Sequence, residues 1–198
     1  EHYFEQGYVS VESLVPADLL AELVAVTDSF LDQSRAETDS GRKFDIGPGH
    51  SSESPVLRRL KSPDDQHNAY WRFASGLMAD VAADIAGPNV IYHHSKLNFK
   101  WFDETDTVKW HQDIQFFPHT NYNVFTIGCY LEDTNMENGP LAVLPGSHNQ
   151  QLYDQYADNG DWNGCLNDRD AATIDMSKAE YLLGAAGSIT IHNCRTLH

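Results

Sequence analysis

The chain has 198 residues, enough for one domain with its own hydrophobic core, and we expect a single domain over residues 1–198. Its formal net charge of −16 argues against nucleic-acid partners and anionic membranes, because both attract basic patches. Apolar residues make up 41 % of the chain, but no apolar run approaches the length of a membrane span.

Helices and a loop are predicted for the first part of the chain. An amphipathic helix is expected over residues 14–31, where leucines and Phe30 can share one face. Residues 39–54 are rich in glycine, serine and charge, which indicates a surface loop. A second helix is expected from about residue 64 or 68 to residue 86, and Gly87-Pro88 ends it.

From residue 89 onward the hydrophobic period becomes that of β-strands. Strands are predicted over residues 90–92 and 96–102. In the second strand Asn98 and Lys100 lie on one polar face, which either lines a pocket or faces solvent. Residues 103–106 are acidic and indicate a solvated hairpin turn.

Residues 108–118 carry an imidazole and a carboxylate two positions apart, in aromatic-rich sequence typical of a strand. On a strand, His111 and Asp113 point to the same face while Gln112 turns away. Two histidines and one carboxylate suit non-haem Fe(II), because they occupy one face of the octahedron and leave three positions open. A His-x-Asp spacing alone is weak evidence, so a third ligand is needed.

Further strands are expected over residues 125–131 and 141–144, separated by a turn that contains Asn138-Gly139. Residues 149–176 form a long insert of low regularity. Residues 187–198 again indicate a strand, and it ends in His198. In a closed or double-sheet β fold, strands distant in sequence become neighbours, so His198 is the best candidate for the third ligand.

Three ordered motifs resemble the phytanoyl-CoA dioxygenase family of Fe(II)- and 2-oxoglutarate-dependent oxygenases. They are His111-Gln112-Asp113, the run from Glu137 to His148, and the ending Cys194-Arg195-Thr196-Leu197-His198. The second and third motifs are similar to the ectoine hydroxylase branch, and Phe4 to Val11 resembles the family's first strand. The resemblance implies a double-stranded β-helix core (jelly-roll, cupin-like), mainly β with flanking α-helices.

The resemblance also implies a mechanism and a set of site residues. Iron is expected on His111, Asp113 and His198, with 2-oxoglutarate and O2 as co-substrates. The expected reaction hydroxylates a C–H bond of a small molecule and releases succinate and CO2. Asn98, Lys100 and Thr126 are expected to contact 2-oxoglutarate.

Other histidines compete for the third position. His148 is expected to be structural, because it follows a turn fixed by Pro145 and Gly146 and because the corresponding histidine of the family does not bind metal. His192 lies six residues before His198, on the same face of an unbroken strand, and a supporting or pocket role is expected for it. The remaining candidates are expected at the surface or in packing: His93, His94 and His119.

The chain departs from the family pattern after His198, where members continue to an arginine that pairs with the far carboxylate of 2-oxoglutarate. We therefore expect a domain truncated at the C-terminus, and Arg195 is expected to face away from the site. Two alternatives stay open, a jelly-roll protein that binds a metal or ligand without oxygenase activity, and a cupin-type isomerase.

Cysteine content and charge also bear on the cellular location and the substrate. Three cysteines without metal-site spacing favour a reducing compartment, and without a signal-peptide pattern the expected location is the cytoplasm. The acidic balance favours a small zwitterionic or cationic metabolite over an acyl-CoA, whose phosphates need a basic patch. The oligomeric state is not predicted.

Overall fold

The computed structural model describes residues 1–101 and 108–198, so the acidic turn predicted over residues 103–106 lies outside the described residues. The contacts divide the chain into two compact units. The first comprises the described residues of Glu1–Leu14 and Thr105–His198, and the second those of Val15–Glu104. None of the helices formed by the described residues is both long enough and apolar enough to cross a bilayer.

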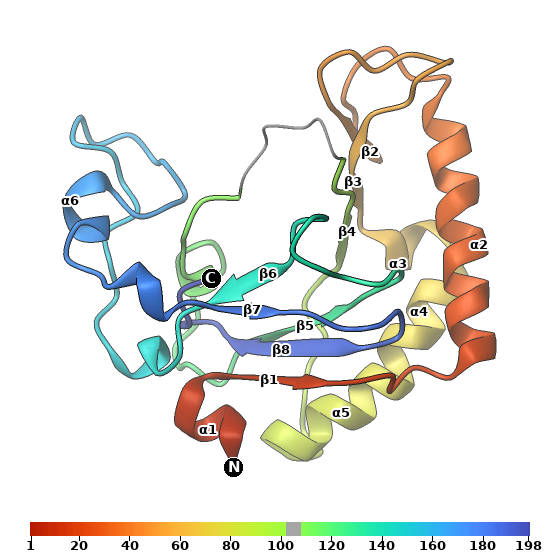
Figure 1. Ribbon diagram of the computed structural model, residues 1–198. Coiled ribbons are helices and arrows are strands. Elements are labelled where there is room, and N and C mark those ends of the chain that lie inside the picture. The colour runs from red at the N-terminus through yellow and green to blue at the C-terminus, as the bar shows by residue number, and fades with distance from the viewer. Residues whose placement is uncertain (102–107) are drawn as a thin grey trace. The chain divides into compact units, whose positions relative to one another are not determined.

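A three-stranded antiparallel sheet forms the centre of the first unit (Figure 1). Strand β8 (Ile189–Asn193) lies between β1 (Tyr8–Val11) and β5 (Phe125–Cys129). Four of the five β8 residues are buried, as expected for a central strand rich in β-branched residues. The strand predicted over residues 125–131 is present but ends at Cys129, and the strand predicted over 187–198 is limited to Ile189–Asn193.

A second, two-stranded sheet packs against the first. It consists of β6 (Leu141–Val143) and β7 (Glu180–Leu182), which run antiparallel. Tyr8 of β1 forms a buried cluster with Val143 and Leu182, and its hydroxyl donates a hydrogen bond to Glu180 Oε2 at 2.6 Å. Apolar side chains from two sheets thus share one core, as in a β-sandwich.

The other elements of this unit are short. They are α1 (His2–Gln6), the 3-10 helices η1 (Asp113–Gln115), η2 (Ser147–Asn149) and η3 (Met176–Lys178), and α6 (Asp168–Ala171). The insert predicted over residues 149–176 is irregular apart from the ends of η2 and η3 and the four residues of α6. A buried cluster of Leu144, Tyr153, Leu166 and Leu197 joins this insert to the strand segments beside it.

Helices dominate the second unit. The predicted first helix is confirmed as α2 (Ala17–Ser34), which buries Leu23, Thr27 and Phe30 at helical spacing. The predicted second helix is divided into α3 (Pro63–Gln66), α4 (Asn68–Ser75) and α5 (Leu77–Ala86). Non-helical dihedral angles at His67 and Gly76 interrupt it, and Gly87 ends α5 as expected.

The second unit also contains a three-stranded antiparallel sheet, in the order β2 (Phe44–Ile46), β3 (Leu57–Lys61) and β4 (Lys96–Asn98). The loop prediction over residues 39–54 missed β2, and β3 was not predicted at all. Within the described part of the chain, residues 90–92 do not form the predicted strand, and the strand predicted from residue 96 ends at Asn98.

Candidate metal centre

Just beyond the end of β8, two segments that are distant in sequence form a short backbone pairing. His111 N donates to His198 O at 3.0 Å, and His198 N donates back to His111 O at 3.2 Å. Ile114 N donates to Cys194 O at 2.9 Å, so the segments run antiparallel over a few residues. The exchange of two hydrogen bonds between one residue pair places the two imidazole rings 4.2 Å apart, measured between centroids.

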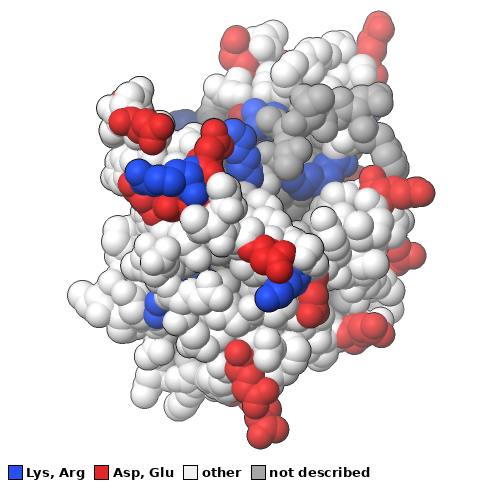
Figure 2. Space-filling view, turned by 60° about the vertical axis from the view of Figure 1, so that its left-hand side comes forward, with Lys and Arg blue, Asp and Glu red and all other residues white. Residues whose placement is uncertain are grey.

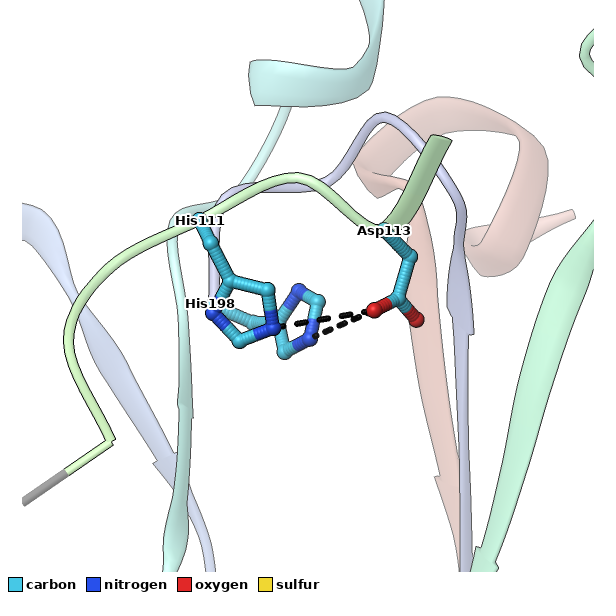
Figure 3. Close-up of side chains that lie close together, drawn as sticks. All are labelled: His111, Asp113 and His198. Atoms are coloured by element: carbon cyan, nitrogen blue, oxygen red, sulfur yellow. Dashed lines mark ion pairs between the residues drawn. The ribbon is translucent and has the colours of Figure 1, made fainter. Parts of the chain in front are cut away.

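His111, Asp113 and His198 converge to form a candidate metal centre (Figure 3). One ligand atom from each lies within 4.8 Å of the others. His111 Nε2 is 3.6 Å and His198 Nε2 is 3.7 Å from Asp113 Oδ1, and the three side chains are at most 10 % exposed. The structure therefore brings together the three residues that the sequence predicts as ligands.

The backbone at this place differs from the predicted strand over residues 108–118. Gln112 is extended, but the 3-10 helix η1 begins at Asp113. Phe116 N donates to Asp113 O, which turns the chain after a pairing of only a few residues. His111 and Asp113 still reach a common point, because the one residue between them is extended.

The turn between α1 and β1 supports the segment that carries His198. Gly7 has φ +84°, and a Cβ there would lie 2.5 Å from His148 Nδ1 and 2.7 Å from Thr196 Oγ1. The Thr196 hydroxyl donates to the Gly7 carbonyl at 2.8 Å. On its other side the segment bonds to the end of β6, where Leu144 N donates to Leu197 O at 2.9 Å. The last residues before His198 are thus fixed from two directions.

Both histidines of the triad are oriented by backbone carbonyls. His111 Nδ1 lies 2.9 Å from Lys109 O, and His198 Nδ1 lies 3.0 Å from Thr196 O. A carbonyl can only accept, so each ring carries its proton on Nδ1. The lone pairs on both Nε2 atoms are then directed at the common point with Asp113, as in metal sites whose histidines donate to carbonyls.

The environment also sets the charge of the ligands. Burial raises the pKa of Asp113, but interactions with His111, His192 and His198 outweigh it and hold the pKa well below its usual range. Burial holds the pKa of His198 well below its usual value, and the charges of His192 and His111 act in the same direction. A charged carboxylate and a neutral imidazole are the forms that bind metals.

Lowering the pH is expected to destabilise the metal-free protein in two steps. Above about pH 6.5, His198 is neutral in both the folded and the unfolded protein. Below this pH the unfolded chain binds a proton at His198, whereas the folded protein does not, because burial lowers the pKa of His198. Each such proton lowers the free energy of unfolding by at most about 1.4 kcal/mol per pH unit. Asp113 acts in the same direction below about pH 4, since its folded pKa is also depressed.

The measurement is urea denaturation between pH 4.5 and 8 in the presence of a chelator, on the parent and on His198→Asn. The parent minus variant difference in unfolding free energy isolates His198 from the other titrating groups. It is expected to be constant above about pH 6.5 and to fall below it. A difference that stays constant down to pH 4.5 would contradict the assignment.

The second oxygen of Asp113 has partners of its own. Thr126 Oγ1 donates to Asp113 Oδ2 at 2.8 Å, and His192 Nε2 lies 3.3 Å from the same oxygen. Thr126 was expected to contact the co-substrate, which stays a prediction; the structure adds the contact with Asp113. His192, expected in a supporting role, is not on a strand continuous with His198, because β8 ends at Asn193.

Gln112 is a residue of this site that sequence reasoning did not assign. Its side chain is fully buried, and Nε2 donates to Arg195 O at 2.7 Å. Its Oε1 accepts from Tyr153 N at 2.9 Å, and its own carbonyl accepts from Gln155 Nε2 at 3.0 Å. Gln112 thereby connects the His111 segment with the His198 segment and with the insert. The sequence signal was a polar residue on the strand face opposite the ligands.

Asn98 and Lys100 belong to the second unit. Asn98 lies on β4 opposite Arg59 of β3, and its Oδ1 accepts from Arg59 Nε at 3.1 Å. Lys100 is exposed beyond the end of β4. Their expected role at 2-oxoglutarate stays a prediction.

The competing residues lie elsewhere. His148 is buried, its Nε2 is 3.2 Å from Phe4 O, and it is not among the three clustered ligands. Arg195 places its guanidinium carbon 4.5 Å from the Tyr122 ring centre and donates to Gln150 O. His93 and His94 are exposed in the second unit, and His119 is exposed in the first.

Comparison with known proteins agrees with the geometry. A probable alpha-ketoglutarate-dependent hypophosphite dioxygenase from Stutzerimonas stutzeri is 29 % identical over 99 % of this chain and 69 % of its own length. An ectoine dioxygenase from Sphingopyxis alaskensis is 28 % identical over 74 % of this chain and 47 % of its own length. The chain thus spans about half to two thirds of these relatives.

The fold is similar to that in the crystal structure of EctD from S. alaskensis with 2-oxoglutarate and 5-hydroxyectoine, with a TM-score of 0.79 and 22 % sequence identity. The match covers 99 % of this chain and 66 % of the EctD chain. This likeness confirms the predicted jelly-roll core with flanking helices. The family described as phytanoyl-CoA dioxygenase (PhyH) matches residues 3–198, which is nearly the whole chain. The chain belongs to the phytanoyl-CoA dioxygenase family.

Proposed function

We propose that this protein is an Fe(II)- and 2-oxoglutarate-dependent dioxygenase that hydroxylates a C–H bond of a small molecule. The observation that carries the proposal is the convergence of two Nε2 atoms and Asp113 Oδ1 in a buried site. Two imidazoles and one carboxylate are the donor set of non-haem Fe(II) oxygenases. The family supports the same activity, and relatives are named as alpha-ketoglutarate-dependent and ectoine dioxygenases.

The residues fit iron in protonation as well as in type. His111, Asp113 and His198 would hold Fe(II), which with 2-oxoglutarate and O2 supplies the oxidation of the C–H bond and releases succinate and CO2. The chain itself contributes orientation and exclusion of water. Backbone carbonyls fix both imidazoles, and burial keeps solvent from the ligand atoms.

The test is an anaerobic titration of the purified protein with Fe(II) and then with 2-oxoglutarate. A visible metal-to-ligand charge-transfer band is expected when both are present, followed by succinate formation when O2 is admitted. If Fe(II) binds at this site but 2-oxoglutarate produces no band, the assignment of 2-oxoglutarate as co-substrate would be contradicted. A band without succinate release would contradict the oxygenase reaction.

For the substrate, we infer a small organic molecule with zwitterionic or cationic character. On the face drawn in Figure 2, basic side chains of the described residues lie in small groups, several of them beside acidic ones. The formal net charge of −16 suits an acyl-CoA poorly, because its phosphates need concentrated basic charge. Succinate formation across a panel of amino-acid derivatives, hypophosphite and an acyl-CoA tests this inference, and faster turnover with hypophosphite or with the acyl-CoA would contradict it. The predicted cytoplasmic location stays a prediction.

Aromatic side chains beside His111 support an organic substrate. The Phe116 ring lies 5.5 Å from the His111 ring and 5.2 Å from Trp162, and Tyr156 lies 5.1 Å from Trp162, all between centroids. The three aromatic rings are each more than 40 % exposed. Exposed aromatic rings beside a polar centre are usual walls of small-molecule sites and attract cations.

Trp162→Ala is expected to raise KM for the substrate about tenfold and to change kcat by less than about twofold, because the ring contributes binding and not chemistry. The measurement is steady-state succinate formation with the substrate found in the panel. Tyr181→Ala, which removes a similarly exposed ring from β7, serves as the control. Equal changes in KM for both variants would contradict a specific role of Trp162 in substrate binding.

A further inference from the structure

The two carboxylate oxygens of Asp113 face different groups. Oδ1 faces the Nε2 atoms of His111 and His198, at 3.6 and 3.7 Å. Oδ2 faces Thr126 Oγ1 at 2.8 Å and His192 Nε2 at 3.3 Å. One oxygen is therefore directed at the candidate metal position, while the other is held by hydrogen-bond donors.

The donors to Oδ2 are placed by the central sheet. Thr126 on β5 and His192 on β8 are direct cross-strand partners, so the register of the sheet brings their side chains to one oxygen. His192 is only 4 % exposed, and its ring centre lies 4.1 Å from that of His198. This placement depends on regular strand pairing and not on a loop, which makes it rigid.

The hydrogen-bond inventory of His192 indicates which nitrogen carries the proton. Its Nδ1 is buried without a hydrogen-bond partner among the described residues. A buried N–H without an acceptor is costly, so the tautomer with its proton on Nε2, toward Asp113 Oδ2, is favoured. Thr126 and His192 then both donate to the same oxygen, and its lone pairs are occupied.

We propose that Thr126 and His192 are positioning residues that restrict Asp113 to metal binding through Oδ1 alone. The inference rests on the proposed function. A carboxylate can bind a metal through one oxygen or two, and a second bound oxygen would occupy one of the three positions that the triad leaves open. Chelation of 2-oxoglutarate and binding of O2 together need all three. Thr126 thus acts through Asp113, beside any contact it makes with the co-substrate.

The test counts water molecules on a metal bound without co-substrate. Mn(II) is the probe, because it accepts oxygen and nitrogen ligands in octahedral geometry and its EPR lines broaden in ¹⁷O-enriched water. The parent is expected to carry three waters on Mn(II). Thr126→Val and His192→Phe each remove one donor to Asp113 Oδ2 while keeping a side chain of similar shape. Each single variant, or the combined variant, is expected to carry two waters on Mn(II) with undiminished Mn(II) affinity.

Two further variants separate positioning from a general structural role. Thr126→Ser keeps the hydroxyl and is expected to restore three waters. Thr190→Val removes the hydroxyl of another buried threonine, on β8 opposite Gly128, and is also expected to leave three waters. Co-substrate is absent throughout, so loss of a direct contact between Thr126 and 2-oxoglutarate cannot change the count.

The outcomes are distinguishable. Two results would overturn the positioning role and leave the proposed function intact. One is three waters in both the parent and the combined variant, and the other is lowered Mn(II) affinity without a change in the water count. Two waters in the parent would overturn the positioning role as well, because Asp113 would already bind through both oxygens. A parent that binds no Mn(II) would overturn the metal site and, with it, the inference.

Discussion

Asp113→Ala is expected to eliminate the charge-transfer band with Fe(II) and 2-oxoglutarate and to lower succinate formation by about 1,000-fold or more, which corresponds to about 4 kcal/mol of lost transition-state stabilisation. Asp113 is the one anionic member of the triad, and its low pKa keeps it charged. Without it, the triad keeps only its two imidazoles, and the donors Thr126 and His192 lose their acceptor. The measurements are the anaerobic titration and a succinate assay.

Two controls make this result specific. Asp113→Asn keeps the shape and an acceptor oxygen but removes the charge, so it is expected to lose the band as well while disturbing the neighbouring residues less. Asp161→Ala removes an exposed carboxylate in the insert and is expected to leave the band and the rate unchanged. A band of full intensity in Asp113→Ala would contradict the metal site.

Gln112→Leu is expected to lower the free energy of unfolding by about 3 kcal/mol, because it leaves buried backbone groups without partners at about 1–3 kcal/mol each. These groups are the Arg195 carbonyl and the Tyr153 amide. Since Gln112 also fixes the His111 segment against the His198 segment, Fe(II) affinity is expected to fall about 10- to 100-fold. Denaturant titration and metal titration measure the two effects.

The matched control is Gln151→Leu, which changes an exposed glutamine of the same region and is expected to alter stability by less than about 0.5 kcal/mol. Gln112→Leu with unchanged stability would show that the insert does not depend on this side chain. Lost stability with unchanged metal affinity would show that the two ligand segments hold their positions without it.

Local sequence patterns predict part of this fold well. Helix α2 follows from apolar residues at helical spacing, and β5 and β6 follow from short apolar runs bounded by turn residues. The three clustered residues His111, Asp113 and His198 were recognisable from one short spacing and one ordered motif. Their role as ligands stays a prediction for the experiments above.

Other elements depend on partners that sequence patterns do not reveal. The charged segment Leu57–Lys61 becomes β3 because it lies between two pairing strands, while residues 90–92, although apolar, have no such partner among the described strands. The hydrogen bond from Thr126 to Asp113 and the contacts of Gln112 arise from cross-strand register and from the path of the insert. These are tertiary features, so residue type alone could not predict them.

The order β1-β8-β5 also has a kinetic consequence. In the central strand pair Tyr8 is opposite His192, so residues from the two ends of the described chain must meet before this sheet exists. Contacts between residues so far apart in sequence require closure of a long loop, which slows folding. During synthesis β1 emerges first and has no β8 to pair with until the chain has been made as far as Asn193. The His111 and His198 segments are likewise far apart in sequence, so the candidate metal centre also forms through long-range pairing and not from a local contact.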